Sequence, residues 1–244
     1  MQNIPLDNLF LLDIETVSSK ENFHLLEDEW KGLWVEKIWR NLNPDTTAEE
    51  MYPQKAAIFA EFARVVCISF GYLKKDEEVW ELRIKSIYGH DEKEILKEFS
   101  ETIVKLPTKK KQWIFTGHNI KEFDIPFLCR RMLANQLPIP HQLNFQNKKP
   151  WDTPILDTLH LWRFGDYKNY TSLKLLAAVL GVPSPKDDID GSQVGNVYWV
   201  EKNLERIARY CEKDVLTLGN IMLRFHGLPI LREDQIVFVR ENNM

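Results

Sequence analysis

The chain has 244 residues, of which 44% are hydrophobic and 11% aromatic. This composition excludes a disordered chain and supplies enough apolar side chains for one large α/β domain, which we expect to span residues 1–244. The 36 acidic residues outnumber the 32 basic ones, and the net charge of −4 disfavours a protein that simply coats nucleic acid.

The sequence contains no segment that predicts membrane insertion or export. No apolar run approaches the roughly 18 residues that span a bilayer, and the first residues lack the basic start and apolar stretch of a signal peptide. Cys67, Cys129 and Cys211 each lie in an apolar stretch and show neither paired nor metal-ligand spacing. We therefore expect three buried thiols and a reducing, cytoplasmic location.

The first predicted element is a short buried strand at residues 8–12, which runs directly into an acidic motif. Residues 21–60 break this pattern because they are rich in Trp and Glu, with Trp30, Trp34 and Ile38 at helical spacing. We interpret them as a helical insertion beside the mouth of the site.

A hairpin and a capped helix follow the insertion. Residues 64–73 and 79–84 predict two strands joined by a charged turn at residues 74–78, and with the first strand they form a meander. A helix is expected over residues 91–103, with Asp91 as its N-cap.

The remaining elements complete a mixed sheet flanked by α-helices. Residues 113–116 predict another buried strand, and helical patterns follow near residues 125–136, 172–180 and 203–225. Strands thus come first and helices later, an order typical of an α/β domain whose sheet is covered by helices.

The first chemical motif is an acidic pair at the end of the first strand. Residues two apart on a strand point to the same face, so Asp13 and Glu15 project together. Two adjacent carboxylates repel each other unless a cation lies between them. A strand end that reaches solvent explains the pair equally well.

The second motif lies between the strand at residues 113–116 and the helix at residues 125–136. Asp124 precedes that helix and, taken alone, is best explained as its N-cap, with Pro126 in the first turn. His118 is interpreted as a loop histidine, because no second His or Cys stands at ligand spacing.

The third motif lies on the long helix at residues 203–225. Its apolar positions form one stripe, and Tyr210 and Asp214, four residues apart, are neighbours on the flank of that stripe. Taken alone, this is also an ordinary helix with a partly exposed Tyr and Asp.

In combination the motifs have a specific order and spacing. Asp-x-Glu, Asn-x3-Phe-Asp and Tyr-x3-Asp resemble the three exonuclease motifs of the Tyr-bearing branch of the DEDD superfamily. More closely, the chain resembles the predicted exonucleases related to the proofreading domain of family B DNA polymerases, including the stretches at residues 172–177 and 190–194. The resemblance covers nearly the whole chain, and residues 21–60 match less closely.

The resemblance implies a ribonuclease H-like fold and metal-dependent hydrolysis of the 3′-terminal phosphodiester. Two Mg²⁺ or Mn²⁺ ions roughly 4 Å apart would clamp the attacking and leaving oxygens. By this analogy Asp13 bridges both ions, and Glu15 and Asp214 complete the shell of the first. Asp124 would hold the second ion near the leaving 3′-oxygen. Carboxylates suit these cations because hard ions prefer oxygen ligands.

Four further residues have roles implied by the same resemblance. Tyr210 would hydrogen-bond the attacking water and orient it. Thr16 and Asn119 would hold the terminal nucleotide. Phe123 would pack against its base, since stacking tolerates any base, or would anchor the following helix in the core.

Other charged residues near the motifs have more than one interpretation. Asp157 would support Asp13 or Asp214 from behind the site, or would cap the next helix. Basic runs are usually solvated turns and helix faces, so none is assigned to the substrate. These runs are residues 109–111, 130–131 and 148–149.

The predicted substrate is a single-stranded 3′ end, with DNA preferred over RNA. An exoribonuclease or oligoribonuclease with the same chemistry is the alternative, because no residue is identified that accepts or rejects a 2′-hydroxyl. A non-catalytic nucleic-acid-binding module would be expected to lose at least one motif side chain. Only thirty residues follow Asp214, so we expect any polymerase or repair partner to be a separate protein.

Overall fold

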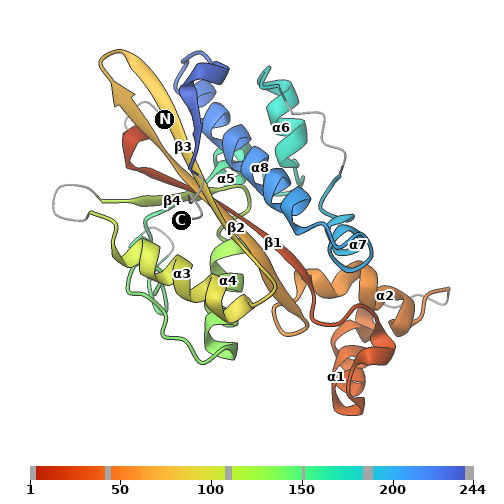
Figure 1. Ribbon diagram of the computed structural model, residues 1–244. Helices are drawn as coiled ribbons and strands as arrows, with labels where there is room; N and C mark the ends of the chain where they lie inside the picture. The colour runs from red at the N-terminus through yellow and green to blue at the C-terminus, as the bar shows by residue number, and fades with distance from the viewer. Residues whose placement is uncertain (1–3, 42–44, 108–111, 150–151, 184–188, 240–244) are drawn as a thin grey trace.

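The fold is seen in a computed structural model that describes residues 4–41, 45–107, 112–149, 152–183 and 189–239. The predicted basic run at residues 109–111 lies outside them. The described strands form one six-stranded sheet in the order β5-β4-β1-β2-β3-β6 (Figure 1). These strands are β1 (Leu9–Ser18), β2 (Ala63–Asp76), β3 (Val79–Tyr88), β4 (Ile114–Gly117), β5 (Ile155–Asp157) and β6 (Ile236–Phe238).

The sheet is mixed, as predicted. β1 pairs with β2 and β2 with β3 in antiparallel fashion, which confirms the meander. β4 is parallel to β1, β5 to β4 and β6 to β3. The hairpin strands continue further than predicted, because Asp76 still pairs with Val79 and only a two-residue turn remains. Residues 74–76 are charged and remain exposed although they belong to β2. Pairing in this part of the hairpin therefore does not require a charge to be buried.

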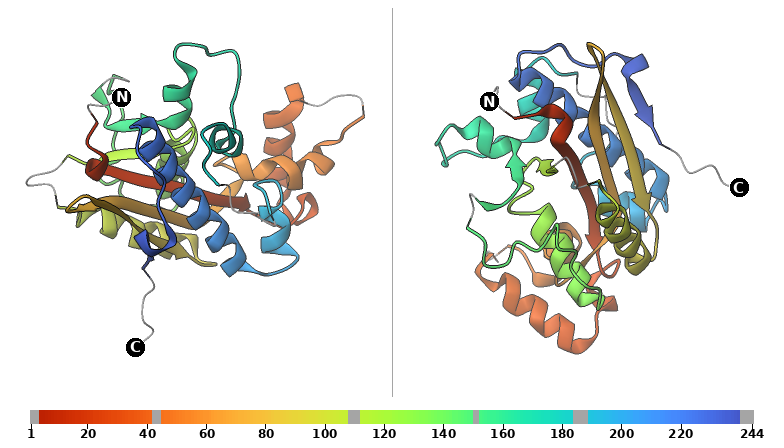
Figure 2. Two further views of the ribbon diagram at one scale, coloured as in Figure 1. Left: turned by 90° about the horizontal axis from the view of Figure 1, so that it is seen from above. Right: turned by 90° about the vertical axis from the view of Figure 1, so that its left-hand side faces the viewer.

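Helices cover both faces of the sheet (Figures 1 and 2), and the long α8 crosses the face opposite to α3 and α4. Within the described chain, every helix is too short or too polar to cross a lipid bilayer. The helices are α1 (Asp28–Ile38), α2 (Ala48–Lys55), α3 (Glu92–Val104), α4 (Asp124–Ala134), α5 (Thr158–Arg163), α6 (Leu173–Val179), α7 (Val194–Trp199) and α8 (Leu204–Phe225).

The central strand β1 divides its side chains between these two layers. Phe10 and Leu12 pack in the cluster beneath α3 and α4, whereas Leu9 and Leu11 pack with the apolar stripe of α8. This alternation follows from the two-residue period of a strand. The next residue on the α8 side is Asp13, so the acidic pair continues a row that is otherwise apolar.

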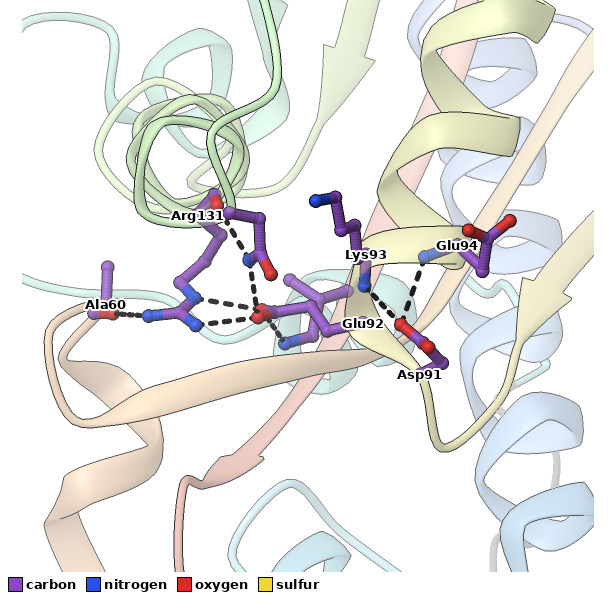
Figure 3. Close-up of polar contacts among 8 residues, drawn as sticks. Ala60, Asp91, Glu92, Lys93, Glu94 and Arg131 are labelled. Carbon is purple, nitrogen blue, oxygen red and sulfur yellow. Dashed lines mark hydrogen bonds and ion pairs between the residues drawn. The ribbon is translucent and has the colours of Figure 1, made fainter.

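The four longer predicted helices are confirmed, but several short elements were not predicted. Helices dominate after the strand at residues 113–116, as expected, but the strands do not all come first, because β5 and β6 are later strands at the two edges of the sheet. Each has three residues, too few to produce a clear hydrophobic period. The predicted cap of α3 is confirmed, since Asp91 accepts hydrogen bonds from the backbone of Lys93 and Glu94 (Figure 3).

Residues 21–60 form the predicted helical insertion between β1 and β2. Its described part contains α1, α2 and three short 3-10 helices, and it packs its own apolar cluster around Trp34 and Tyr52. The Trp34 indole donates a 2.7 Å hydrogen bond to the carbonyl of Ala48, which ties α1 to the start of α2. Trp30, on the same helix, is 40% exposed and packs edge-on against Phe62.

A buried ion pair fixes α4 to the rest of the fold (Figure 3). The Arg131 guanidinium donates two hydrogen bonds, of 2.9 and 2.6 Å, to the Glu92 carboxylate and a third, of 2.8 Å, to the carbonyl of Ala60. The backbone N–H of Val65 and the side chain of Asn135 also donate to Glu92. These contacts hold α4 against α3, β2 and the end of the insertion, and α4 begins at Asp124.

Replacement of Glu92 by Ala is expected to lower the free energy of unfolding by about 3 kcal/mol, because it leaves the Arg131 guanidinium without a counter-charge in a site shielded from water. Urea unfolding followed by circular dichroism measures this. The matched control is Glu101→Ala, which removes an exposed partner of Lys105 and should cost less than about 1 kcal/mol. Equal losses for the two variants would contradict a structural role for Glu92.

Candidate active site

The acidic motif of β1 faces a pocket of about 810 Å³ beside α8. Leu11 and Val17, on the same side of the strand, pack in clusters that include α8 residues, so Asp13 and Glu15 project toward this helix. Seven of the predicted site residues line the pocket. They are Asp13, Glu15, Asn119, Phe123, Asp124, Tyr210 and Asp214.

Asp124 enters the pocket from the start of α4, but not as the predicted cap. It is the first residue of the helix, and Phe123 occupies the N-cap position without a side-chain hydrogen bond. The Asp124 carboxylate accepts hydrogen bonds from its own backbone N–H and from that of Ile14 on β1. The cap interpretation is therefore wrong by one position, and the carboxylate bridges α4 to the central strand.

The long helix α8 supplies the third side of the pocket. Cys211 and Val215 belong to its buried apolar stripe, whereas Tyr210, Asp214 and Thr217 follow at the i, i+4 and i+7 positions and line the pocket. The Tyr210 hydroxyl is hydrogen-bonded to Asp214. The predicted proximity of the phenol and the carboxylate on one helix flank is thus present.

Burial and mutual repulsion destabilise the ionised forms of these acids. Desolvation raises the pKa of Asp13 well above its ordinary value, and the negative charges of Asp214 and Asp124 raise it further. The pKa of Glu15 is raised by burial and then by Asp13. Burial raises the pKa of Asp124 to about 7. Desolvation and Asp214 raise the pKa of the Tyr210 phenol, so that group stays protonated at neutral pH.

The donor set fits hard divalent cations. Oxygen atoms of Asp13 and Glu15 and the Cys211 sulfur lie within 4.8 Å of one another, which is close enough to share an ion. However, Cys211 donates a hydrogen bond to Asp13 Oδ2 at 3.2 Å, and burial raises the pKa of its thiol, so it stays protonated. The available ligands are then carboxylate oxygens, which Mg²⁺ and Mn²⁺ prefer. A cation among them would offset the repulsion that raises their pKa values.

Asp157 holds the loop that leads to Asp124. It is buried, it caps α5 through the N–H of Leu159, and its two oxygens accept hydrogen bonds from the backbone N–H of Asn119 at 3.0 Å and Lys121 at 3.2 Å. The predicted cap is confirmed. The support expected for Asp13 or Asp214 goes instead to the loop of the second motif.

The three predicted substrate residues differ in position. Asn119 and Phe123 line the pocket. The ring centres of Phe123 and Phe127 are 5.2 Å apart, so the Phe123 side chain both forms part of the pocket wall and anchors α4. The structure does not bring Thr16 into the pocket. Its side chain is buried and donates a 2.8 Å hydrogen bond to the carbonyl of Ala57, just after a register shift in the pairing of β1 with β2.

Several lining residues had no role assigned from the sequence. Ser172, Lys174 and Asp190 lie in the two stretches that carried the closer family resemblance, and all three border the pocket. Lys174 brings a positive charge to a lining otherwise dominated by acids. His118 also borders the pocket, but its ring nitrogens contact Thr158 and Thr171, as expected for a loop histidine.

Comparison with protein families places most of the chain in a described family. Residues 58–230 match a family described as "Predicted 3'-5' exonuclease related to the exonuclease domain of PolB". The match includes the second and third motifs, whereas β1 and most of the insertion precede it. A search of curated proteins finds no significant similarity.

The metal-free protein is expected to lose stability as pH rises from 6 to 8. The folded state keeps a proton on Asp124 up to a pKa of about 7, whereas the unfolded chain releases it near pH 4. The stabilisation that this proton provides is therefore complete below pH 4 and is lost as pH rises through 7. Between pH 6 and 8 the free energy of unfolding falls by on the order of 1 kcal/mol. Thermal unfolding in EDTA measures the effect.

The Asp124→Asn variant is the control for this titration. It should show a flatter dependence of Tm on pH than the wild-type protein, and Mn²⁺ should raise the wild-type Tm more at pH 8 than at pH 6. A wild-type Tm that does not change between pH 6 and 8 in EDTA would contradict the raised pKa.

Proposed function

The chain belongs to the family of predicted 3′-5′ exonucleases related to the exonuclease domain of PolB, and from this premise we propose that it removes nucleotides from the 3′ end of single-stranded DNA with divalent cations as cofactors. The observation that carries the proposal is the convergence of four carboxylates and one phenol on a single pocket from β1, α4 and α8. Ser172 and His118 also line the pocket, but the Ser172 hydroxyl caps α6 and the His118 ring nitrogens contact Thr158 and Thr171.

The four carboxylates are proposed as the metal ligands. Asp13 is proposed to contact two ions, as the family resemblance implies, and the charges of both Asp214 and Asp124 act on it. Glu15 and Asp214 would then serve one ion and Asp124 the other. When bound, the cations would supply Lewis-acid activation of a water and neutralise charge on the phosphate oxygens.

Tyr210 is proposed to position the attacking water. Its phenol stays protonated because burial and the adjacent carboxylate raise its pKa, so it is a poor base at neutral pH. The hydroxyl donates its proton to Asp214, which fixes its direction and leaves its oxygen to accept a hydrogen bond from the water. Tyr210 therefore orients the attacking water, and another group in contact with that water must accept its proton.

The rest of the lining supports a nucleotide as the bound group. Asn119 offers an amide beside Asp124, and Phe123 offers an aromatic surface that accepts any base. Lys174 provides a positive charge for a phosphate oxygen. These contacts are independent of base identity, which suits an enzyme that shortens strands of any sequence.

The assigned residues predict a graded set of activities with Mn²⁺ on a 5′-labelled single strand. Asp13→Ala and Asp214→Asn should abolish the stepwise ladder of products, because the cation site loses charge and ligands. Tyr210→Phe should slow it by up to about 100-fold without abolishing it, since only the orientation of the water is lost. Asp234→Asn is the control, because Asp234 is exposed and does not line the pocket. Normal activity of Asp13→Ala would refute the assigned site.

The identity of the sugar is tested by a direct comparison. Matched DNA and RNA oligonucleotides, each single-stranded and duplex, should give the highest kcat/KM for single-stranded DNA, because the family is related to a DNA polymerase domain. A higher kcat/KM for RNA would favour an exoribonuclease that uses the same carboxylates. Loss of all activity in EDTA is expected for every substrate.

A further inference from the structure

A second pocket, of about 790 Å³, adjoins the catalytic pocket. Ile58 and Gly191 line both, so the two hollows meet at these residues. One wall of the second pocket comes from the insertion, at Asn22 and at the end of α2, and the other from the segment that leads into α7 and from α7 itself. Figures 1 and 2 show the insertion beside α7 at the same end of β1.

We propose that this adjoining pocket binds the nucleotides that precede the scissile phosphate, so that the insertion forms one wall of the substrate groove. The inference rests on the proposed exonuclease function. With the terminal nucleotide at the carboxylates, the rest of the strand must leave through space continuous with the catalytic pocket. The second pocket provides that space, and both volumes lie in the range of roughly 300–1,000 Å³ that encloses a ligand of nucleotide size.

The chemistry of the lining suits a nucleic-acid strand. Gln54, Ser192 and Asn196 present amide and hydroxyl groups, the side chains that commonly contact phosphates and sugars. Asn22 also lines the pocket, and its side-chain oxygen is shielded from solvent without a hydrogen-bond partner in the described part of the chain. Lys55 adds a positive charge, and Glu21 is the acid of the described lining.

Trp199 forms a fixed part of the inner wall, with two cations beside its ring. Its indole donates a 3.2 Å hydrogen bond to Ser18 at the end of β1. Arg64 lies 5.1 Å and Lys202 5.3 Å from the centre of its ring system, so cations already contact the aromatic surface. The ring thus serves as a fixed wall with nearby positive charge, and the pocket is suited to recognise a backbone more than to stack a base.

The wall contributed by the insertion lies outside the family match, which begins at residue 58. Ser18, Asn22, Gln54 and Lys55 all precede that boundary. The pocket is therefore assembled from a segment that the family match does not cover and from α7, which lies within the match. Its effect should appear in how the strand is held and not in the chemistry of hydrolysis.

Gly195 offers a way to fill the pocket without removing a contact. It lies within α7, it lines the second pocket but not the catalytic one, and a Cβ atom there would meet no atom within 4 Å. A Gly195→Phe variant should therefore place its ring in the groove, and replacing a helical glycine does not weaken the helix.

Two substrates separate the subsite from the catalytic centre: a single-stranded DNA oligonucleotide, and the p-nitrophenyl ester of thymidine 5′-monophosphate, which has no preceding nucleotide. Gly195→Phe should raise KM for the oligonucleotide about tenfold, a loss of about 1.4 kcal/mol, and leave KM and kcat for the ester unchanged. Gly32→Phe is the matched control, because Gly32 is also helical, has open space at its Cβ position and lies in neither pocket.

A second variant tests the charge without adding bulk. Lys55→Ala should weaken oligonucleotide binding and reduce the slope of log affinity against log salt concentration by about 0.7, as expected for one lost phosphate contact to a single strand. An unchanged ratio of oligonucleotide to ester KM in Gly195→Phe, together with an unchanged salt slope in Lys55→Ala, would overturn the subsite. Failure of the wild-type protein to hydrolyse either substrate would instead overturn the exonuclease function.

Discussion

The site depends on holding like charges together in a place shielded from water. Asp13 and Glu15 stand in a row of β1 side chains that is otherwise apolar, and Asp214 and Asp124 approach from helices on the same pocket. Each raised pKa reports the cost of this arrangement. The fold bears that cost because apolar clusters on both sides of the carboxylates fix the strand and the helix regardless of charge. The same cost makes the pocket favourable for divalent cations.

Neighbouring parts of the fold fix where each carboxylate lies. The ion pair of Glu92 and Arg131 holds α4 against β2, and Asp157 holds the loop that precedes it. Asp124 then reaches the backbone of β1 directly. None of these supporting groups faces the pocket. They act by limiting the movement of α4, which matters because a carboxylate displaced by about an ångström is a much poorer ligand or positioning group.

Local periodicity accounts for what the sequence could predict. Residues two apart on a strand and four apart on a helix must share a face, so the pairs Asp13–Glu15 and Tyr210–Asp214 follow from spacing alone. Features set by distant segments could not be found this way. A register shift with β2 accompanies the placement of Thr16 against Ala57, the backbone of β1 draws Asp124 away from the cap position, and the thiol of Cys211 meets Asp13 only in the folded chain. The edge strands β5 and β6 are too short to leave a pattern.

The proposed function divides chemistry and substrate contact between different parts of this chain. The carboxylates belong to the central strand and to two helices that pack on opposite faces of the sheet, so their geometry is tied to the core and tolerates little change. The insertion packs around its own cluster of Trp34 and Tyr52 and meets the site only at its edge, through Ile58. Its surface can therefore vary without moving a proposed metal ligand. With the proposed function, a hydrolytic centre whose contacts do not depend on the base and an independently packed wall would allow strand preference to change while the reaction stays the same.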